Sequence, residues 1–423
     1  MPSRKIILRT AGALVLLTII GGGLTVWRTL TTLTTTDTLL RTIPLTAPSA
    51  PGDIRIDEQA GRALINGDAS GGLDRSALTL LDTRSGNIVR TIRLTNSARL
   101  SVAIASQAGR IVVLDSGSRY NTWGTTVRLL DERSGALVRT TTVGLDPLAV
   151  AVDERAGHVF VASTGPSDRY GNARGAGTVS MLDARGGALL HMANVGLRPR
   201  EMAADERTGR LFVANYTGNS MSVLDTRTGA VIATTRVGIN PTSIAVDDQT
   251  GRVFVASEGS NIISMLDART GALLRIIATG FPTALAVDRT AGHLLVASVG
   301  PHTPAGISLL DARTGALISR VETGGSPEDI AVDERTGRAF VTDTQLGRRL
   351  YDPLHRLLGV GLSWAGENNM DGMSVIDTRS GNVLRTVHTG PAARLGVAVD
   401  ARVGHAFVVS YQNRDVQMFD ATQ

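Results

Sequence analysis

Residues Ile239–Gly280, INPTSIAVDDQTGRVFVASEGSNIISMLDARTGALLRIIATG, hold the unit that the rest of the chain repeats. The stretch contains four short apolar runs, and a turn signal closes each of them. Apolar residues alternate with small or polar ones and β-branched residues are frequent, which favours half-buried strands over helix. The Gly-bearing turns between the runs suit tight antiparallel hairpins. Four antiparallel strands in roughly forty residues predict one blade of a β-propeller.

Two series of residues recur with this unit and give the number of blades. An Asp ends each third strand, and a Gly lies in the turn before each second strand. The aspartates are Asp82, Asp131, Asp183, Asp225, Asp267, Asp311, Asp377 and Asp420, and the glycines are Gly61, Gly109, Gly157, Gly209, Gly251, Gly292, Gly337 and Gly404. Both series have eight members. We therefore predict an all-β fold of eight blades, with seven as the alternative if the first unit proves degenerate.

The two ends of the chain each hold part of one blade. Residues 39–45, LLRTIPL, match the fourth strand of the repeat and lack the three strands that should precede them. Residues 395–420 supply a first, second and third strand without a fourth. We expect the N-terminal strand to join the C-terminal blade and close the ring, which hides edges that would otherwise pair with other chains.

The N-terminus predicts a membrane segment. Arg4, Lys5 and Arg9 precede an uncharged, mostly apolar run at residues 10–27, about the length that spans a bilayer. Its length, the triple Gly at 21–23 and the lack of an Ala-x-Ala site favour a retained transmembrane helix over a cleaved signal. Positive charge on the N-terminal side places the body outside the cytoplasm, in the periplasm or at the cell surface. The expected segments are a basic cytoplasmic piece (1–9), the anchor or signal (10–27), a Thr-rich linker (28–38) and the propeller (39–423).

Composition excludes several classes of function. The chain has no Cys, so disulfides, thiolate metal sites and thiol nucleophiles are impossible. The formal charge is +5, but Arg4, Lys5, Arg9 and Arg28 supply four of the 43 basic residues, which leaves 39 basic against 38 acidic residues in the remainder. We therefore expect no nucleic-acid partner. A Gly-x-Ser-x-Gly nucleophile motif is absent, and a phosphate-binding loop is excluded because Lys5 is the only lysine.

The insertions predict which face of the disc carries function. Turns between strands one and two, and between strands three and four, scarcely vary in length. The excess residues fall mainly between the second and third strands, at 116–125, 164–177 and 344–372. These loops share one face with the connections that enter each first strand. We expect function on this loop-rich face, opposite a face of minimal turns.

The second and third strands resemble the YVTN-type repeat of bacterial and archaeal surface propellers. The closest unit is residues 211–229, LFVANYTGNSMSVLDTRTG, and residues 253–271 are nearly as close. The resemblance covers essentially everything from residue 39 onward and implies the propeller fold. Relatives with this repeat include surface-layer proteins, non-catalytic propeller subunits of quinoprotein dehydrogenases, and propeller lactonases, so for activity it implies only a set of options.

Arg and aromatic residues on the loop-rich face are the candidate binding residues. The loops of adjacent blades echo each other at 119–121 (RYN) and 169–172 (RYGN), a mix enriched in recognition patches. The largest insertion, 343–372, has helical spacing over 350–358. The candidates are Arg119, Tyr120, Trp123, Arg169, Tyr170, Tyr216, Arg348, Tyr351, His355, Trp364, Tyr411 and Arg414.

The same pattern predicts no catalytic or metal site. Each third-strand Asp precedes a Gly turn, where its side chain accepts backbone N–H bonds. His158, His293 and His405 occupy a slot that Arg fills in other repeats, and only His302 and His355 fall in elaborated loops. We expect no catalytic residue, no metal and no cofactor. A Ca²⁺ site built from loop Asp and Asn oxygens stays open as an alternative.

We predict a membrane-anchored, extracytoplasmic, monomeric propeller that serves as a binding or scaffold module. Its partner would be a protein or small ligand on the loop-rich face, and residues 10–27 would contact the membrane. One alternative is a non-catalytic subunit of an electron-transfer complex. The other is a lactonase-like hydrolase or lyase, which would be favoured by convergence within ligand distance of three or more of Asp168, Glu258, His302, Asp343, His355 and Glu367.

Overall fold

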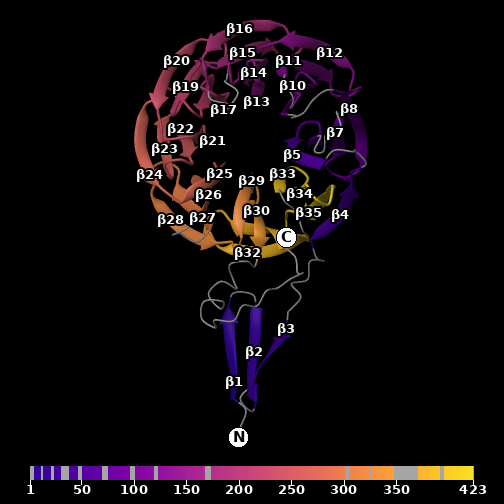
Figure 1. Cartoon of the computed structure of the whole chain (residues 1–423), viewed down its shortest axis with the longest axis vertical. Helices are drawn as coiled ribbons and strands as arrows, with labels where there is room; N and C mark the ends of the chain where they lie inside the picture. Colours follow the sequence, from indigo (N-terminus) through magenta and orange to yellow (C-terminus); the bar gives the residue numbers. More distant parts are fainter. Residues whose placement is uncertain are drawn as a thin grey trace. The chain divides into compact units, whose positions relative to one another are not determined.

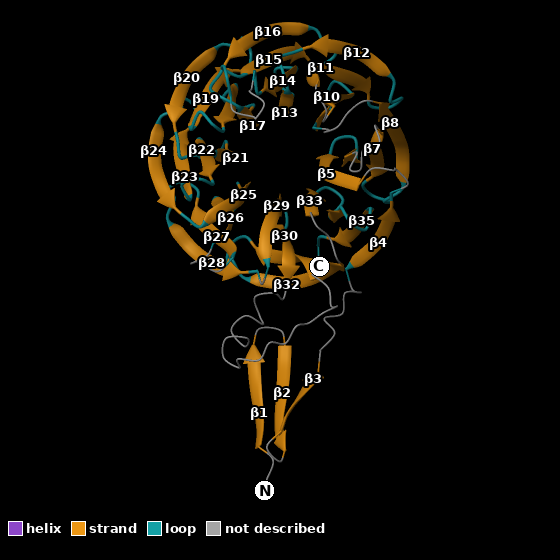
Figure 2. Cartoon of the chain, in the orientation of Figure 1, coloured by secondary structure: helices purple, strands orange, loops and turns teal. Residues whose placement is uncertain are grey.

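The computed structural model describes residues 4–10, 13–20, 23–29, 38–45, 50–68, 75–95, 101–118, 122–166, 173–300, 305–323, 325–346, 370–390 and 395–422. The chain divides into two compact units, Met1–Leu39 and Leu40–Gln423. Figure 2 shows strands and loops, without helices, in the described parts of both units.

The first unit contains a three-stranded antiparallel sheet in the order β1 (Arg4–Thr10), β2 (Ala13–Ile20) and β3 (Gly23–Thr29). We had expected a membrane-spanning helix over residues 10–27, and the structure does not support it. No helix in the described part of the chain is long and apolar enough to cross a bilayer. The physical reason for strands is local, because β-branched residues favour extended backbone and Gly weakens a helix.

The second unit is a ring of eight sheets, each with four antiparallel strands (Figure 1). Blades 1 to 4 consist of β5 (Ala50–Asp57), β6 (Arg62–Asp68), β7 (Arg75–Asp82) and β8 (Ile88–Thr95); β9 (Val102–Ala105), β10 (Arg110–Ser118), β11 (Thr122–Asp131) and β12 (Leu137–Thr142); β13 (Pro147–Asp153), β14 (His158–Ser163), β15 (Thr178–Asp183) and β16 (Leu189–Asn194); and β17 (Pro199–Asp205), β18 (Arg210–Asn215), β19 (Ser220–Asp225) and β20 (Val231–Arg236). The eight-bladed prediction is confirmed.

The remaining blades follow the same order from the ring centre outward. Blades 5 to 8 consist of β21 (Pro241–Asp247), β22 (Arg252–Ser257), β23 (Ile262–Asp267) and β24 (Leu273–Ala278); β25 (Phe281–Asp288), β26 (His293–Val299), β27 (Gly306–Asp311) and β28 (Leu317–Glu322); β29 (Ser326–Asp333), β30 (Arg338–Leu346), β31 (Met370–Asp377) and β32 (Val383–Gly390); and β33 (Leu395–Asp400), β34 (His405–Ser410), β35 (Asp415–Asp420) and β4 (Leu39–Pro44). First strands line the ring centre and fourth strands form its outer edge (Figure 1).

The closure of the ring is confirmed. Strand β4 is the outer strand of blade 8, next to β35. Beyond β4, the backbone N–H of Leu45 donates to the carbonyl of Arg414 at 3.0 Å. The side chain of Ile43 is 2% exposed and belongs to one apolar cluster with Ile54, Phe407 and Met418, which joins blade 8 to blade 1. One sheet thus combines both ends of the propeller.

The third-strand aspartates are turn caps, as the repeat predicts. Asp82 accepts the backbone N–H of Ser85 through Oδ1 at 2.9 Å, and Asp267 accepts that of Thr270 at the same distance. These bonds fix the short hairpins of the minimal face. On the other face, the expected loop at 116–125 is mostly sheet, because β10 runs to Ser118 and β11 begins at Thr122 around a bulge after Asp115.

A candidate recognition site on the loop-rich face

The loop-rich face is held together by hydrogen bonds between two kinds of loop. In blade 4 the backbone N–H of Tyr216, in the loop after the second strand, donates to the carbonyl of Arg198, in the connection that enters the blade (2.9 Å). In blade 5 the N–H of Glu258 donates in the same way to the carbonyl of Asn240 (3.1 Å). The two loops of each blade therefore present their side chains together.

Arg198 adopts an unusual backbone conformation. Its φ is +53°, the same as that of Asn240 at the equivalent position of blade 5. Asn and Asp tolerate this left-handed region, whereas a long side chain does so at a cost of order 1 kcal/mol. The connection that enters blade 4 thus carries local strain at an arginine.

Two arginines and a carboxylate surround Tyr216. The guanidinium carbons of Arg200 and Arg198 lie 4.9 Å and 5.7 Å from the centre of the ring, within cation–π range. The phenol O–H donates to Oε1 of Glu258 in the neighbouring blade at 2.8 Å. That hydrogen bond is the main reason that the pKa of Tyr216 is raised. The half-buried ring is therefore fixed from three sides, and Arg200 stays exposed.

Exposed apolar side chains flank this cluster on three consecutive blades. Leu197 and Ile239 occupy the connections that enter blades 4 and 5, and Phe281 is the first residue of β25 in blade 6; they are 40%, 52% and 40% exposed. Leu197 precedes Arg198 and Ile239 precedes Asn240, so both lie directly beside the hydrogen-bonded loop pairs, whereas Phe281 directly precedes Pro282 of blade 6. The site thus combines cations, an oriented aromatic ring and apolar area, the composition of interface hot spots.

Charged residues continue from this cluster into the ring centre. Arg55 forms an ion pair with Asp53 at 2.9 Å, and Glu201 and Asp329 are also near enough, after Asp53, to raise the pKa of Arg55. Burial raises the pKa of the Glu201 carboxyl to about 7, and Arg55 opposes that shift. The Arg55 side chain is 60% exposed, so water screens these charges.

The three carboxylates share one position in the repeat. Asp53, Glu201 and Asp329 each follow a bulge in the first strand, two residues after a Pro. A bulge re-aims the side chain that follows it. The sequence contained this signal as the spacing Pro-x-Asp/Glu, but only the closed ring reveals that Arg55 interacts with carboxylates from blades 4 and 7.

The structure places four of the twelve predicted binding residues in described loops or strands of this face. Tyr216 lies in the site above. Trp123 is in β11 opposite Gly117, where only its backbone is described. Tyr411 and Arg414 lie in the turn between the second and third strands of blade 8, four blades away from Tyr216 around the ring. The other eight predicted binding residues lie outside the described residues: Arg119, Tyr120, Arg169, Tyr170, Arg348, Tyr351, His355 and Trp364.

Sequence reasoning missed Leu197, Arg198, Arg200 and Ile239. One signal was present, because Arg198 stands where blade 5 has Asn240, ahead of the same Pro. An arginine at a left-handed backbone position, which favours Asn or Gly, is a departure from the repeat that the sequence alone shows.

Two of the six residues proposed for an enzyme site are described. Glu258 binds Tyr216, and Asp343 is 0% exposed. Asp168, His302, His355 and Glu367 lie outside the described residues. Within the described ranges, no group of three or more His, Asp or Glu side chains could hold a metal ion.

Asp343 is a buried carboxyl without a cationic partner in its hydrogen bonds. Thr323 Oγ1 donates to its Oδ1 at 2.5 Å and Ser374 Oγ donates to its Oδ2 at 2.9 Å. Burial raises its pKa to about 7, and the two hydroxyls lower it only in part. Its position between two strands of blade 7 suits a structural acid.

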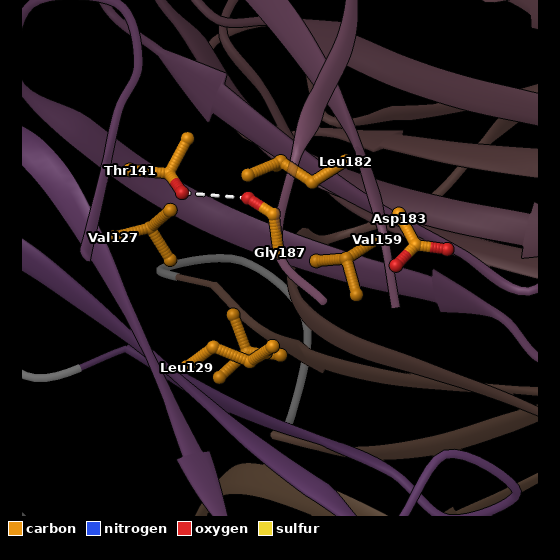
Figure 3. Close-up of a pocket in the computed structure, with 8 residues that line it drawn as sticks. Val127, Leu129, Thr141, Val159, Leu182, Asp183 and Gly187 are labelled. Carbon is orange, nitrogen blue, oxygen red and sulfur yellow. Dashed lines mark hydrogen bonds between the residues drawn. The ribbon is translucent and has the colours of Figure 1, made fainter. Parts of the chain in front are cut away.

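A small gap separates blades 2 and 3 (Figure 3). Its volume is about 10 Å³, enough for one water at most. Val127 and Leu129 line it from one side and Val159 and Leu182 from the other. Thr141 Oγ1 donates to the Gly187 carbonyl at 2.6 Å beside it. The gap is a packing defect between apolar sheets and too small for a ligand.

Comparisons with known proteins show the fold alone. No family model matches the chain, and no curated protein sequence matches it. The structure is similar to the computationally designed Ika8 protein (13% identity, 89% of this chain and 98% of that chain, TM-score 0.62) and to Saccharomyces cerevisiae Sqt1 (11%, 91% and 99%, TM-score 0.67). It is also similar to BamB from Moraxella catarrhalis (17%, 81% and 94%, TM-score 0.51). At these identities the likeness establishes a β-propeller, without a choice among propeller families.

Proposed function

We propose that this protein is a non-catalytic binding module that holds a protein partner on its loop-rich face, at blades 4 to 6. The observation that carries the proposal is the oriented Tyr216 ring, which Arg198, Arg200 and Glu258 hold in place. Exposed Leu197, Ile239 and Phe281 at the entries of blades 4, 5 and 6 add apolar area on the same face. Aromatic and Arg residues dominate binding energy at interfaces, and exposed apolar neighbours add contact area that excludes water.

We also propose that the repeat belongs to the YVTN type and that the body works outside the cytoplasm, held near a membrane by its N-terminal segment. Support comes from the repeat at residues 211–229 and from the basic residues before the apolar run at 10–27. Because the chain has no Cys, a single introduced Cys at any position can carry a thiol-reactive label without competition from other thiols.

The test begins with a photo-crosslinking amino acid at Ile239 in the full chain, in the native cell. The matched control position is Gln412, an exposed residue of the blade 8 turn. A partner captured from Ile239 and not from Gln412 is then purified, and its affinity for the full chain is measured by calorimetry. We expect Arg200→Ala and Tyr216→Ala each to weaken binding by about tenfold or more.

The double variant Tyr411→Ala/Arg414→Ala serves as the control, because it removes the same two residue types from blade 8. Equal loss in both variant sets would disprove a site at blades 4 to 6. Capture of a small molecule with chemical turnover in the purified protein would support the hydrolase alternative instead.

A further inference from the structure

The hairpins between third and fourth strands carry a second repeated surface, on the minimal face. In seven blades the hairpin reads Arg, then Ser, Thr or Gly, then Gly, then Ala or Asn, and then two apolar residues that open the fourth strand. The arginines of these hairpins are all exposed: Arg84, Arg133, Arg185, Arg227, Arg269, Arg313 and Arg379.

The apolar residues after these arginines are exposed too. Leu137 is 58% exposed and Leu317 63%, so more than half of each residue is open to solvent. Every blade contributes at least one such residue: Leu39 and Leu40, Ile88 and Val89, Leu137 and Val138, Leu189 and Leu190, Val231 and Ile232, Leu273 and Leu274, Leu317 and Ile318, and Leu384. We call these residues and the seven arginines the arginine–apolar rim.

The arginines of the rim are left without ion pairs among the described residues, although the charge of Arg379 helps to lower the pKa of Asp377 in its own hairpin. The Asp at the start of each hairpin is already engaged: Asp225 accepts backbone N–H groups of its own turn and pairs with Arg210 of the second strand at 3.1 Å. Asp131 pairs in the same way with Arg110 at 3.0 Å. None of the seven rim arginines forms an ion pair with another described residue.

The rim lies along one edge of the disc. All fourth strands begin at the same face, because the strands of each blade alternate in direction and the blades repeat around the ring. Strand β4 also begins there, at Leu39. A peptide would touch one or two blades, whereas an extended flat surface engages basic and apolar groups of all of them.

We propose that the arginine–apolar rim rests on the surface of an anionic lipid bilayer. Arginines at the surface pair with lipid phosphates, and each contributes about fivefold to membrane affinity. The apolar pairs enter the headgroup boundary, as the apolar side of an interfacial segment does. The basic residues and apolar run that precede Leu39 favour the same environment. The loop-rich face then points away from the membrane.

The test uses the full chain on vesicles, with one environment-sensitive label per molecule. Ala230→Cys puts the label on the rim of blade 4, and Thr217→Cys puts it on the loop-rich face of the same blade; both positions are exposed. Lipid-borne quenchers report the contact in vesicles of phosphatidylglycerol and phosphatidylethanolamine, and in vesicles of phosphatidylcholine alone. We expect quenching at 230 and not at 217, and stronger quenching in the anionic vesicles.

Paired charge variants then show whether the membrane affinity comes from the rim or from the N-terminal segment. Arg227→Gln/Arg269→Gln removes two rim charges, and Arg93→Gln/Arg236→Gln removes two exposed charges elsewhere on outer strands. We expect the first pair to lower the affinity that quenching at 230 reports by about 30-fold in anionic vesicles, and the second pair to change it less than threefold. Equal quenching at 217 and 230, no preference for anionic lipid, or equal effects of the two pairs would each overturn the proposal. A rim that responds to no vesicle would indicate a protein surface as its partner and would overturn it as well.

Discussion

Nδ1 of His405, in the last blade, lies 2.8 Å from the carbonyl oxygen of Thr83 in the first blade, 322 residues away in the sequence. A carbonyl oxygen only accepts, so Nδ1 carries the hydrogen. His158 makes the same contact with the Thr226 carbonyl of the next blade at 2.8 Å. The sequence suggested histidines that merely replace Arg in the repeat; in the ring they are links between neighbouring blades.

His405→Ala should therefore weaken the junction that closes the ring. We expect the free energy of unfolding to fall by about 1 kcal/mol, the worth of one partly buried hydrogen bond. Urea titration followed by circular dichroism measures the change. His191→Ala, at an exposed position of an outer strand, should change stability by less than about 0.5 kcal/mol. A larger effect at His191 would contradict the inter-blade role.

Ile43→Ala should destabilise the protein more strongly. Ile43 is 2% exposed among Ile54, Phe407 and Met418, and its truncation leaves a cavity between the first and last blades. We expect a loss of about 2 to 4 kcal/mol. Leu40→Ala, in the same strand at 48% exposure, is the control and should cost less than about 1 kcal/mol. Similar losses in both variants would mean that β4 is not packed as described.

Asp343 should make stability depend on pH. Its pKa rises from 3.8 to about 7 on folding, because burial disfavours the charged form. The folded protein thus holds the proton more tightly than the unfolded chain. The contribution of Asp343 is most favourable below pH 3.8, and it is lost as the pH rises through about 7. Asp343→Asn should therefore raise stability at pH 8 relative to the wild type.

The expected gain at pH 8 is on the order of 2 to 4 kcal/mol, and it should shrink towards pH 4. Urea midpoints of both proteins at several pH values measure it. Burial raises the pKa of Glu201 in the same direction, so the difference between the two proteins isolates Asp343. A difference that is constant from pH 4 to pH 8 would argue against a titrating carboxyl at this position.

Tyr216 should ionise only at unusually high pH. The hydrogen bond to Glu258 is the largest cause of its raised pKa, and burial adds to it. Absorbance near 295 nm should reveal a tyrosine transition above the usual range of a phenol. Glu258→Gln should move that transition to lower pH, and Tyr216→Phe should remove it. If Glu258→Gln leaves the transition in place, the carboxylate does not bind the phenol in solution.

The sequence predicted the fold to the level of blade number and ring closure. Repetition made this possible, since Asp225 and Asp267 mark the same turn in successive units. A unit that departs from the pattern at one position is still recognised from its other positions and from its neighbours. The strand-like part of the 116–125 insertion was missed, because a bulge after Asp115 lets the hairpin continue beyond the repeat.

The candidate site was predictable only in part. Tyr216 was identified because it is an aromatic residue in a loop of the face that the insertions mark. Arg198 and Arg200 were not, because their role depends on a ring that only the folded loop places between them. The charge of Glu201 in blade 4 helps to raise the pKa of Arg55 in blade 1, an effect between distant parts of the sequence that no local pattern encodes. The role of a side chain that departs from the repeat becomes clear only from the residues that surround it in the folded structure.

Because β4 belongs to blade 8, its pairing is delayed during biosynthesis. The six residues Leu39–Pro44 leave the ribosome about 370 residues before their hydrogen-bonding neighbour β35 does. At a synthesis rate of about 5 to 20 residues per second, β4 stays without its neighbouring strand for roughly 20 to 75 seconds. During that interval an apolar edge is open to mispairing or to a chaperone, so premature termination shortly before Asp415 would leave it permanently unmatched.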